Sequence, residues 1–224
     1  MNLRAFSYLK GKHAKLSPSQ AARWANKDLG KDELFKMISS KYATEIGTLL
    51  HKYAEDAILT KTKVYKTDKK EVRKWLILNG IPERIAYDYS NRTFYNLMVY
   101  VNDCIGYRME PEVELGYISE ELAEKAGRYV EPVCFGTADA ISYKNNLLRI
   151  SDYKSGVTPA HMEQLMTYAA LFCMQNNLKP GLIKIELRIY QLDGVIYHEP
   201  EADEILPIMD RIVRYDKWLT NLFD

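Results

Sequence analysis

Residues 133–154 read Val-Cys-Phe-Gly-Thr-Ala-Asp-Ala-Ile-Ser-Tyr-Lys-Asn-Asn-Leu-Leu-Arg-Ile-Ser-Asp-Tyr-Lys, and this stretch decides the fold. Two runs rich in apolar residues flank Asn145-Asn146, a pair typical of tight turns, and so predict a β-hairpin. Asp139 then lies on one arm, and Asp152 and Lys154 lie at the end of the other. Because side chains alternate along a strand, Asp152 and Lys154 share a face.

Helices and strands are predicted on both sides of this hairpin. Helical spacing and caps predict helices over 17–30, 42–59, 69–78 and 82–105, and alternation predicts a strand over 112–117. After the hairpin we expect a helix over 159–176, strands over 182–192 and 195–198 joined at Asp193-Gly194, and a helix over 201–222. This order predicts an α/β or α+β fold, with one mixed sheet flanked by helices.

Length and composition predict one domain, 1–224, in which the expected elements form a helical part over 1–110 and a sheet with helices over 111–224. The chain has 224 residues, 47% of them hydrophobic, and one core accounts for them. No leader-like segment opens it, and no apolar run approaches the roughly 18 to 20 residues of a membrane span. Its three cysteines form no Cys-x-x-Cys pair. We therefore expect a soluble protein of a reducing cytoplasm, the host's if the source is viral.

Charge is segregated along the chain although the formal net charge is only +1. Residues 1–31 hold seven Lys or Arg against Asp28, residues 61–74 hold seven against two acids, and residues 199–204 are acidic. Such segments are typical of solvated helix faces and equally of a surface that binds a polyanion.

Asp139, Asp152 and Lys154 form the set that phosphodiester hydrolysis requires. Two carboxylates hold a hard divalent cation through oxygen, and a lysine acts near the attacking water or the developing negative charge. The plain alternative is a surface Asp-Lys pair at the end of a strand, since charged pairs are common there. The surrounding motifs favour the catalytic interpretation.

Four motifs occur in order: Gly47-Thr48-Leu49-Leu50-His51 with Glu55, Phe135-Gly136-Thr137-Ala138-Asp139-Ala140, Ile150-Ser151-Asp152-Tyr153-Lys154-Ser155-Gly156, and Gln164-x-x-x-Tyr168. This order resembles RecB-like nucleases of the PD-(D/E)XK superfamily, including phage-encoded and CRISPR-associated exonucleases. The resemblance runs from about Ser17 to about Phe172, and it implies a restriction-endonuclease-like core.

The resemblance also implies roles for individual residues. Asp139, Asp152 and Lys154 would be catalytic, and His51, Asp139, Asp152 and the Tyr153 carbonyl would hold Mg²⁺ or Mn²⁺. A second ion would use Glu114 or Glu55, and Gln164 and Tyr168 would position DNA. On composition alone, His51 and Glu55 are a solvated helix pair, Glu114 is an acid on an exposed strand, and Tyr168 belongs to the core.

The expected function is a metal-dependent DNA exonuclease of DNA recombination, repair or phage DNA processing, acting on ends of single- or double-stranded DNA. The basic segments would hold the phosphate backbone. A homo-oligomer or a recombination partner protein is compatible with the sequence, and no membrane partner is expected. With three cysteines and no phosphate-binding loop, neither an iron-sulfur cluster nor ATP is expected. The alternatives are a structure-specific or nonspecific endonuclease, and a non-catalytic DNA-binding protein with a relic nuclease site.

Overall fold

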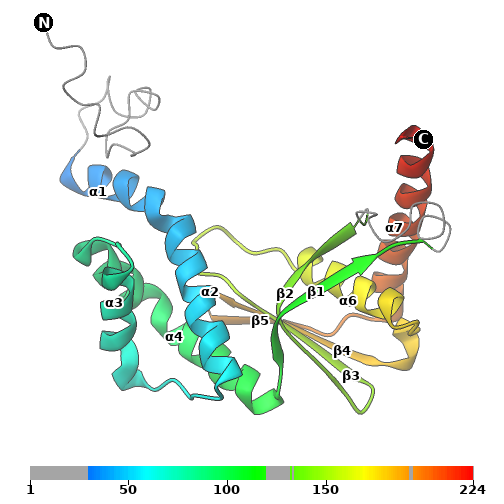
Figure 1. Cartoon of the computed structure of the whole chain (residues 1–224), viewed down its shortest axis with the longest axis horizontal. Helices are drawn as coiled ribbons and strands as arrows, with labels where there is room; N and C mark the ends of the chain where they lie inside the picture. The colour runs from blue at the N-terminus through cyan, green and yellow to red at the C-terminus, as the bar shows by residue number, and fades with distance from the viewer. Residues whose placement is uncertain (1–29, 120–131, 133, 192–193, 224) are drawn as a thin grey trace, which may run out of the picture. The chain divides into compact units, whose positions relative to one another are not determined.

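The computed structural model describes residues 30–119, 132, 134–191 and 194–223 (Figure 1). The chain divides into two compact units, Met1–Glu45 and Ile46–Asp224. The predicted helix over 17–30 and most of the basic N-terminal segment lie outside the described residues. In the first unit, α1 spans Lys31–Ser39 and η3 spans Ser40–Tyr42. Glu33 accepts the backbone N–H of Gly30 and so caps the first turn of α1.

The three helices predicted between residues 42 and 107 are confirmed. They are α2 (Ala43–Leu59), α3 (Lys69–Leu78), which follows η4 (Lys66–Asp68), and α4 (Glu83–Tyr107). In α2 the apolar residues Ile46, Leu50 and Ala54 repeat at helical spacing and are buried. Gly80 adopts a φ of 92° and separates α3 from α4.

The second unit contains a sheet of five strands in the order β1-β2-β3-β4-β5 (Figure 1). The strands are β1 (Glu110–Tyr117), β2 (Cys134–Lys144), β3 (Leu147–Tyr153), β4 (Lys184–Gln191) and β5 (Gly194–His198). All neighbouring pairs are antiparallel except β3 and β4. Asn145 and Asn146 both have positive φ, 53° and 58°, as a tight hairpin turn requires. The predicted central hairpin is thus confirmed.

The parallel pairing of β3 with β4 follows from the helix between them. Parallel neighbours need a crossover connection, which α6 (Glu163–Gln175) and η6 (Pro180–Leu182) supply. The last helix is α7 (Ala202–Phe223), which packs against α6. The predicted fold class, a mixed sheet flanked by helices, is therefore confirmed and is consistent with a restriction-endonuclease-like core. No helix of the described residues is long and apolar enough to cross a membrane.

The two faces of β3 bury different side chains. Leu148 and Ile150 point into an apolar core shared with Leu165 of α6. Tyr153 points to the other side, where its ring stacks on Tyr100 of α4 with ring centroids 5.7 Å apart. The sheet is therefore packed on both faces, against α6 on one side and α4 on the other.

Candidate metal centre

Asp139 lies where the β2–β3 hairpin ends. The register pairs Ala140 with Ser151, which places Asp139 opposite Asp152. Oδ2 of Asp139 accepts the backbone N–H of Tyr153 at 2.9 Å, so the carboxylate is tied to the neighbouring strand. The side chain of Asp139 is 15% exposed and that of Asp152 is 2% exposed. The hairpin thus brings together the two carboxylates that the motifs indicated.

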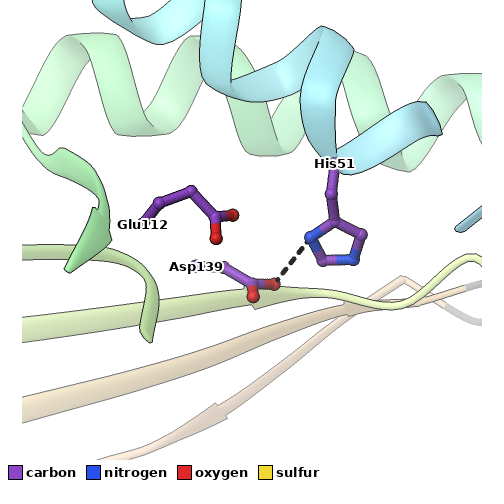
Figure 2. Close-up of side chains that lie close together, drawn as sticks. All are labelled: His51, Glu112 and Asp139. Carbon is purple, nitrogen blue, oxygen red and sulfur yellow. Dashed lines mark ion pairs between the residues drawn. The ribbon is translucent and has the colours of Figure 1, made fainter. Parts of the chain in front are cut away.

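His51 reaches the same carboxylate from α2. Its Nδ1 lies 3.4 Å from Oδ2 of Asp139. The dashed line in Figure 2 marks this pair. The imidazole is 29% exposed and its ring lies against that of Tyr153, with centroids 5.6 Å apart. His51 is therefore not part of a solvated pair with Glu55: it faces the sheet.

Glu112 completes the cluster, and sequence reasoning did not assign it a role. The recorded pairs Pro111 with Ala140 and Val113 with Ala138 place Glu112 opposite Asp139. Ligand atoms of His51, Glu112 and Asp139 all lie within 4.8 Å of one another, and Figure 2 shows the three side chains converging. Glu112 has a φ of 52°, which is uncommon for a residue other than glycine. Of the acids Glu112 and Glu114 on this strand, the resemblance implied a metal role for Glu114, as a ligand of a second ion, and none for Glu112.

The two residues suggested for a second ion, Glu114 and Glu55, are not part of this cluster. Glu114 is exposed and pairs with Thr137, two residues along the strand from Glu112. Glu55 receives a hydrogen bond from Lys52 Nζ at 3.0 Å on the surface of α2. Neither belongs to the group formed by His51, Glu112 and Asp139, so their role as ligands stays a prediction.

The electrostatics of the cluster follow from burial and from crowded acids. Burial, reinforced by the charge of Asp152, raises the pKa of Asp139 well above that of a free carboxyl. Burial also raises the pKa of Glu112 and lowers the pKa of His51 below its ordinary 6.5. The imidazole of His51 is thus neutral at pH 7. It therefore provides no positive charge to balance the carboxyl groups that it faces.

A second set of contacts leads from Asp152 to α6. Lys154 Nζ donates to Asp152 Oδ1 at 2.9 Å and to Gln164 Oε1 at 3.2 Å. Gln164 Nε2 in turn lies 3.3 Å from the Tyr168 hydroxyl. The structure therefore links the residues predicted for catalysis with those predicted to position DNA.

The close approach of Tyr168 explains why the second motif has a glycine at position 136. A Cβ atom at this position would lie 3.1 Å from Cε1 of Tyr168, closer than such atoms normally approach. The glycine lets the aromatic ring lie directly on β2. Tyr168 is accordingly half-buried. It is less buried than the core position that composition alone suggested.

One family model matches most of the chain. It is described as "Protein of unknown function (DUF2800)" and matches residues 13–214. The chain belongs to this family. The family description names no activity, and no curated protein matches the chain.

A solved structure described as "Crystal structure of SSO0001" is similar to this DUF2800 protein with a TM-score of 0.32 and 16% sequence identity. The comparison covers 76% of this chain and 86% of the other. A likeness of this size says nothing about function, which depends on the site and not on the fold.

The side chains of this DUF2800 protein suit a divalent cation. Imidazole nitrogen and carboxylate oxygen are ordinary ligands of first-row transition metals, and carboxylates also suit Mg²⁺. Oδ2 of Asp152 is buried and, among the described residues, has no hydrogen-bond partner. A buried carboxylate oxygen without a partner is costly, so it is a plain candidate for a cation.

A cleft gives access to the cluster. Its volume is about 490 Å³. Its lining consists of residues of α2 and of the first two strands: Gly47, Thr48, His51, Lys52, Glu55, Glu112 and Asp139. The candidate ligands of this DUF2800 protein are therefore open to a substrate from one side.

Proposed function

We propose that this protein is a metal-dependent deoxyribonuclease that degrades DNA from its ends. The observation that carries the proposal is the meeting of His51, Glu112 and Asp139 within 4.8 Å beside the Asp152 and Lys154 pair. An acidic cluster with an imidazole and one adjacent lysine supplies both ligands and a cation for a reaction at phosphate.

His51, Glu112, Asp139 and Asp152 would hold Mg²⁺ or Mn²⁺, with the Tyr153 carbonyl as a further predicted ligand. When bound, such an ion lowers the pKa of a coordinated water and polarises the phosphate. Tyr153 contributes its backbone N–H, which fixes one oxygen of Asp139. Its buried ring lies against the imidazole of His51.

Lys154 would stabilise negative charge on the phosphate as the bond to the leaving oxygen breaks. Its side chain is 33% exposed, so the ammonium group can turn toward a bound strand while Asp152 and Gln164 restrict its positions. A lysine is a compact point charge suited to this role. We assign Gln164 and Tyr168 to holding the DNA strand beside it.

DNA is the proposed substrate because the chemistry is directed at phosphodiesters and basic residues are concentrated in two segments. The structure describes the second of these segments, residues 61–74, which covers η4 and much of α3. Its exposed residues include Lys61, Lys63, Lys66 and Lys70. Such residues bind phosphate without reading bases, so binding should weaken as salt rises.

The test is cleavage of matched linear and circular DNA. The purified chain is incubated with Mg²⁺ or Mn²⁺ and single- or double-stranded circles, beside the same molecules made linear. We expect short products from linear DNA and surviving circles, because no base-reading motif is available to choose internal sites. Asp139→Asn is the matched control and should cut nothing.

The other outcomes separate the alternatives. Circles cut as fast as linear DNA would favour an endonuclease. DNA bound without cleavage in either metal would favour a DNA-binding protein with a relic site, and would defeat the proposal.

A further inference from the structure

Gln191 is a buried polar residue that the proposed chemistry does not use. It is the last residue of β4 and is 7% exposed. A side-chain amide is costly to bury unless its donors and acceptor are satisfied. Gln191 therefore needs hydrogen-bond partners nearby, and these partners indicate what the side chain does.

The partners of Gln191 are three backbone groups of a single loop. Its Nε2 donates to the carbonyls of Gly156 at 3.0 Å and Thr158 at 2.6 Å. Its Oε1 accepts the N–H of Ala160 at 3.2 Å. One side chain thus holds the loop between β3 and α6 at every second residue from 156 to 160.

This loop joins the two halves of the candidate site. It begins at Lys154, whose own backbone N–H donates to the carbonyl of Tyr190 at 2.9 Å. It ends at α6, where Gln164 lies in the first turn and contacts Lys154 Nζ. The last two residues of β4 therefore fix the loop at its start and along its length.

We propose that Gln191 is a positioning residue for this site, which sets the place of Gln164 relative to Lys154 by holding residues 156–160. The proposal rests on the proposed nuclease function. The three hydrogen bonds of Gln191 go to none of the candidate metal ligands, so its loss should leave metal binding in place. A shift of about 1 Å in a catalytic group can lower a rate about a hundredfold, so a displaced loop should reduce cleavage.

Two variants of Gln191 and one control test the proposal. Gln191→Leu removes all three hydrogen bonds, and Gln191→Glu keeps the acceptor while losing both donors. Glu186→Gln, on the same strand as Gln191, is the control: it weakens the 2.7 Å ion pair with Arg149 of β3, and among the described residues no hydrogen bond or ion pair joins Glu186 to the loop. Each protein is compared with the parent in thermal stability, Mn²⁺-induced stabilisation, hydrogen exchange over residues 156–164 and cleavage of linear DNA.

We expect both Gln191 variants to exchange faster over 156–164 and to lose about tenfold or more in cleavage at saturating metal, while Mn²⁺ still stabilises them. Glu186→Gln should lose stability but keep its cleavage rate within about twofold. The proposal is overturned if Gln191→Leu cleaves like the parent, or if Glu186→Gln loses as much activity at equal stability. If the parent itself cleaves no DNA, the proposed function fails, and unchanged exchange in Gln191→Leu would separately show that Gln191 does not hold the loop.

Discussion

Nδ1 of His51 lies 3.4 Å from Oδ2 of Asp139, which brings a helix and a distant hairpin to one point. The gap is longer than the roughly 2.8 Å of a charge-assisted hydrogen bond. Because burial lowers the pKa of His51 and raises the pKa of Asp139, the two groups do not form an ordinary ion pair at neutral pH. The arrangement suits two ligands that face a common cation.

Lys154→Ala should abolish cleavage while folding and metal binding persist. Lys154 is argued to act on the transition state, since its ammonium group lies beside Asp152 but cannot coordinate a metal. We expect a loss of about a hundredfold or more in cleavage, roughly 2.7 kcal/mol in barrier. Lys144→Ala, at the opposite end of the same hairpin, is the control. Activity within about tenfold of the parent would remove Lys154 from the catalytic set.

Glu112→Gln should weaken metal binding far more than Glu114→Gln. Of these two described glutamates, Glu112 and not Glu114 belongs to the group whose ligand atoms, with those of His51 and Asp139, lie within 4.8 Å of one another. The measurement is the rise in melting temperature on adding Mn²⁺, because a ligand that binds the native state stabilises it. We expect the rise to be largely lost in Glu112→Gln and retained in Glu114→Gln. The reverse result would return the role to Glu114.

Glu112→Gly should stabilise the metal-free protein while impairing metal binding. The φ of 52° at Glu112 costs an ordinary residue roughly 1 to 2 kcal/mol, and glycine escapes this cost. Glycine is entropically unfavourable in a strand, so we expect a net gain of up to about 1 kcal/mol. Glu114→Gly, where φ is not positive, should instead lose about 0.5 to 1 kcal/mol. Urea unfolding in the presence of EDTA measures both, and a loss of stability in Glu112→Gly would contradict the strain.

The metal-free protein should lose stability as pH rises, through Asp139. Its pKa is raised from 3.8 to about 8 in the folded state, so folding favours the protonated carboxyl. This contribution is complete below pH 3.8 and is lost as pH rises through about 8. Asp139→Asn does not titrate, so its stability relative to the parent should increase with pH. Melting curves in EDTA test this, and parallel pH profiles of the two proteins would refute it.

Saturating metal should remove this pH dependence in the parent. A bound cation favours the ionised carboxylates, which reverses the preference of the buried site for protons. The melting temperature of the parent in Mn²⁺ should then stay level or rise between pH 5 and about 8. A profile that falls as it does in EDTA would place the ion away from Asp139.

The sequence by itself determined the central hairpin and the meeting of Asp139 with Asp152. Asn145-Asn146 can adopt the positive φ values of a tight turn at little cost, and that turn fixes the register of the strands that follow. The apolar repeat of α2 likewise specified which of its faces is buried. These are local effects, set by neighbours in sequence.

Only the tertiary structure decided that Glu112, rather than Glu114, faces His51. The two acids lie two residues apart on one strand, so alternation places them on the same face and cannot separate them. The choice depends on where α2 meets the sheet and on a backbone conformation that a glutamate rarely adopts. The role of Gln191 was equally hidden, because a glutamine at the end of a strand has no periodic or motif signal. Its three partners come from a loop far from it in sequence, and such contacts exist only once β3 and β4 have paired.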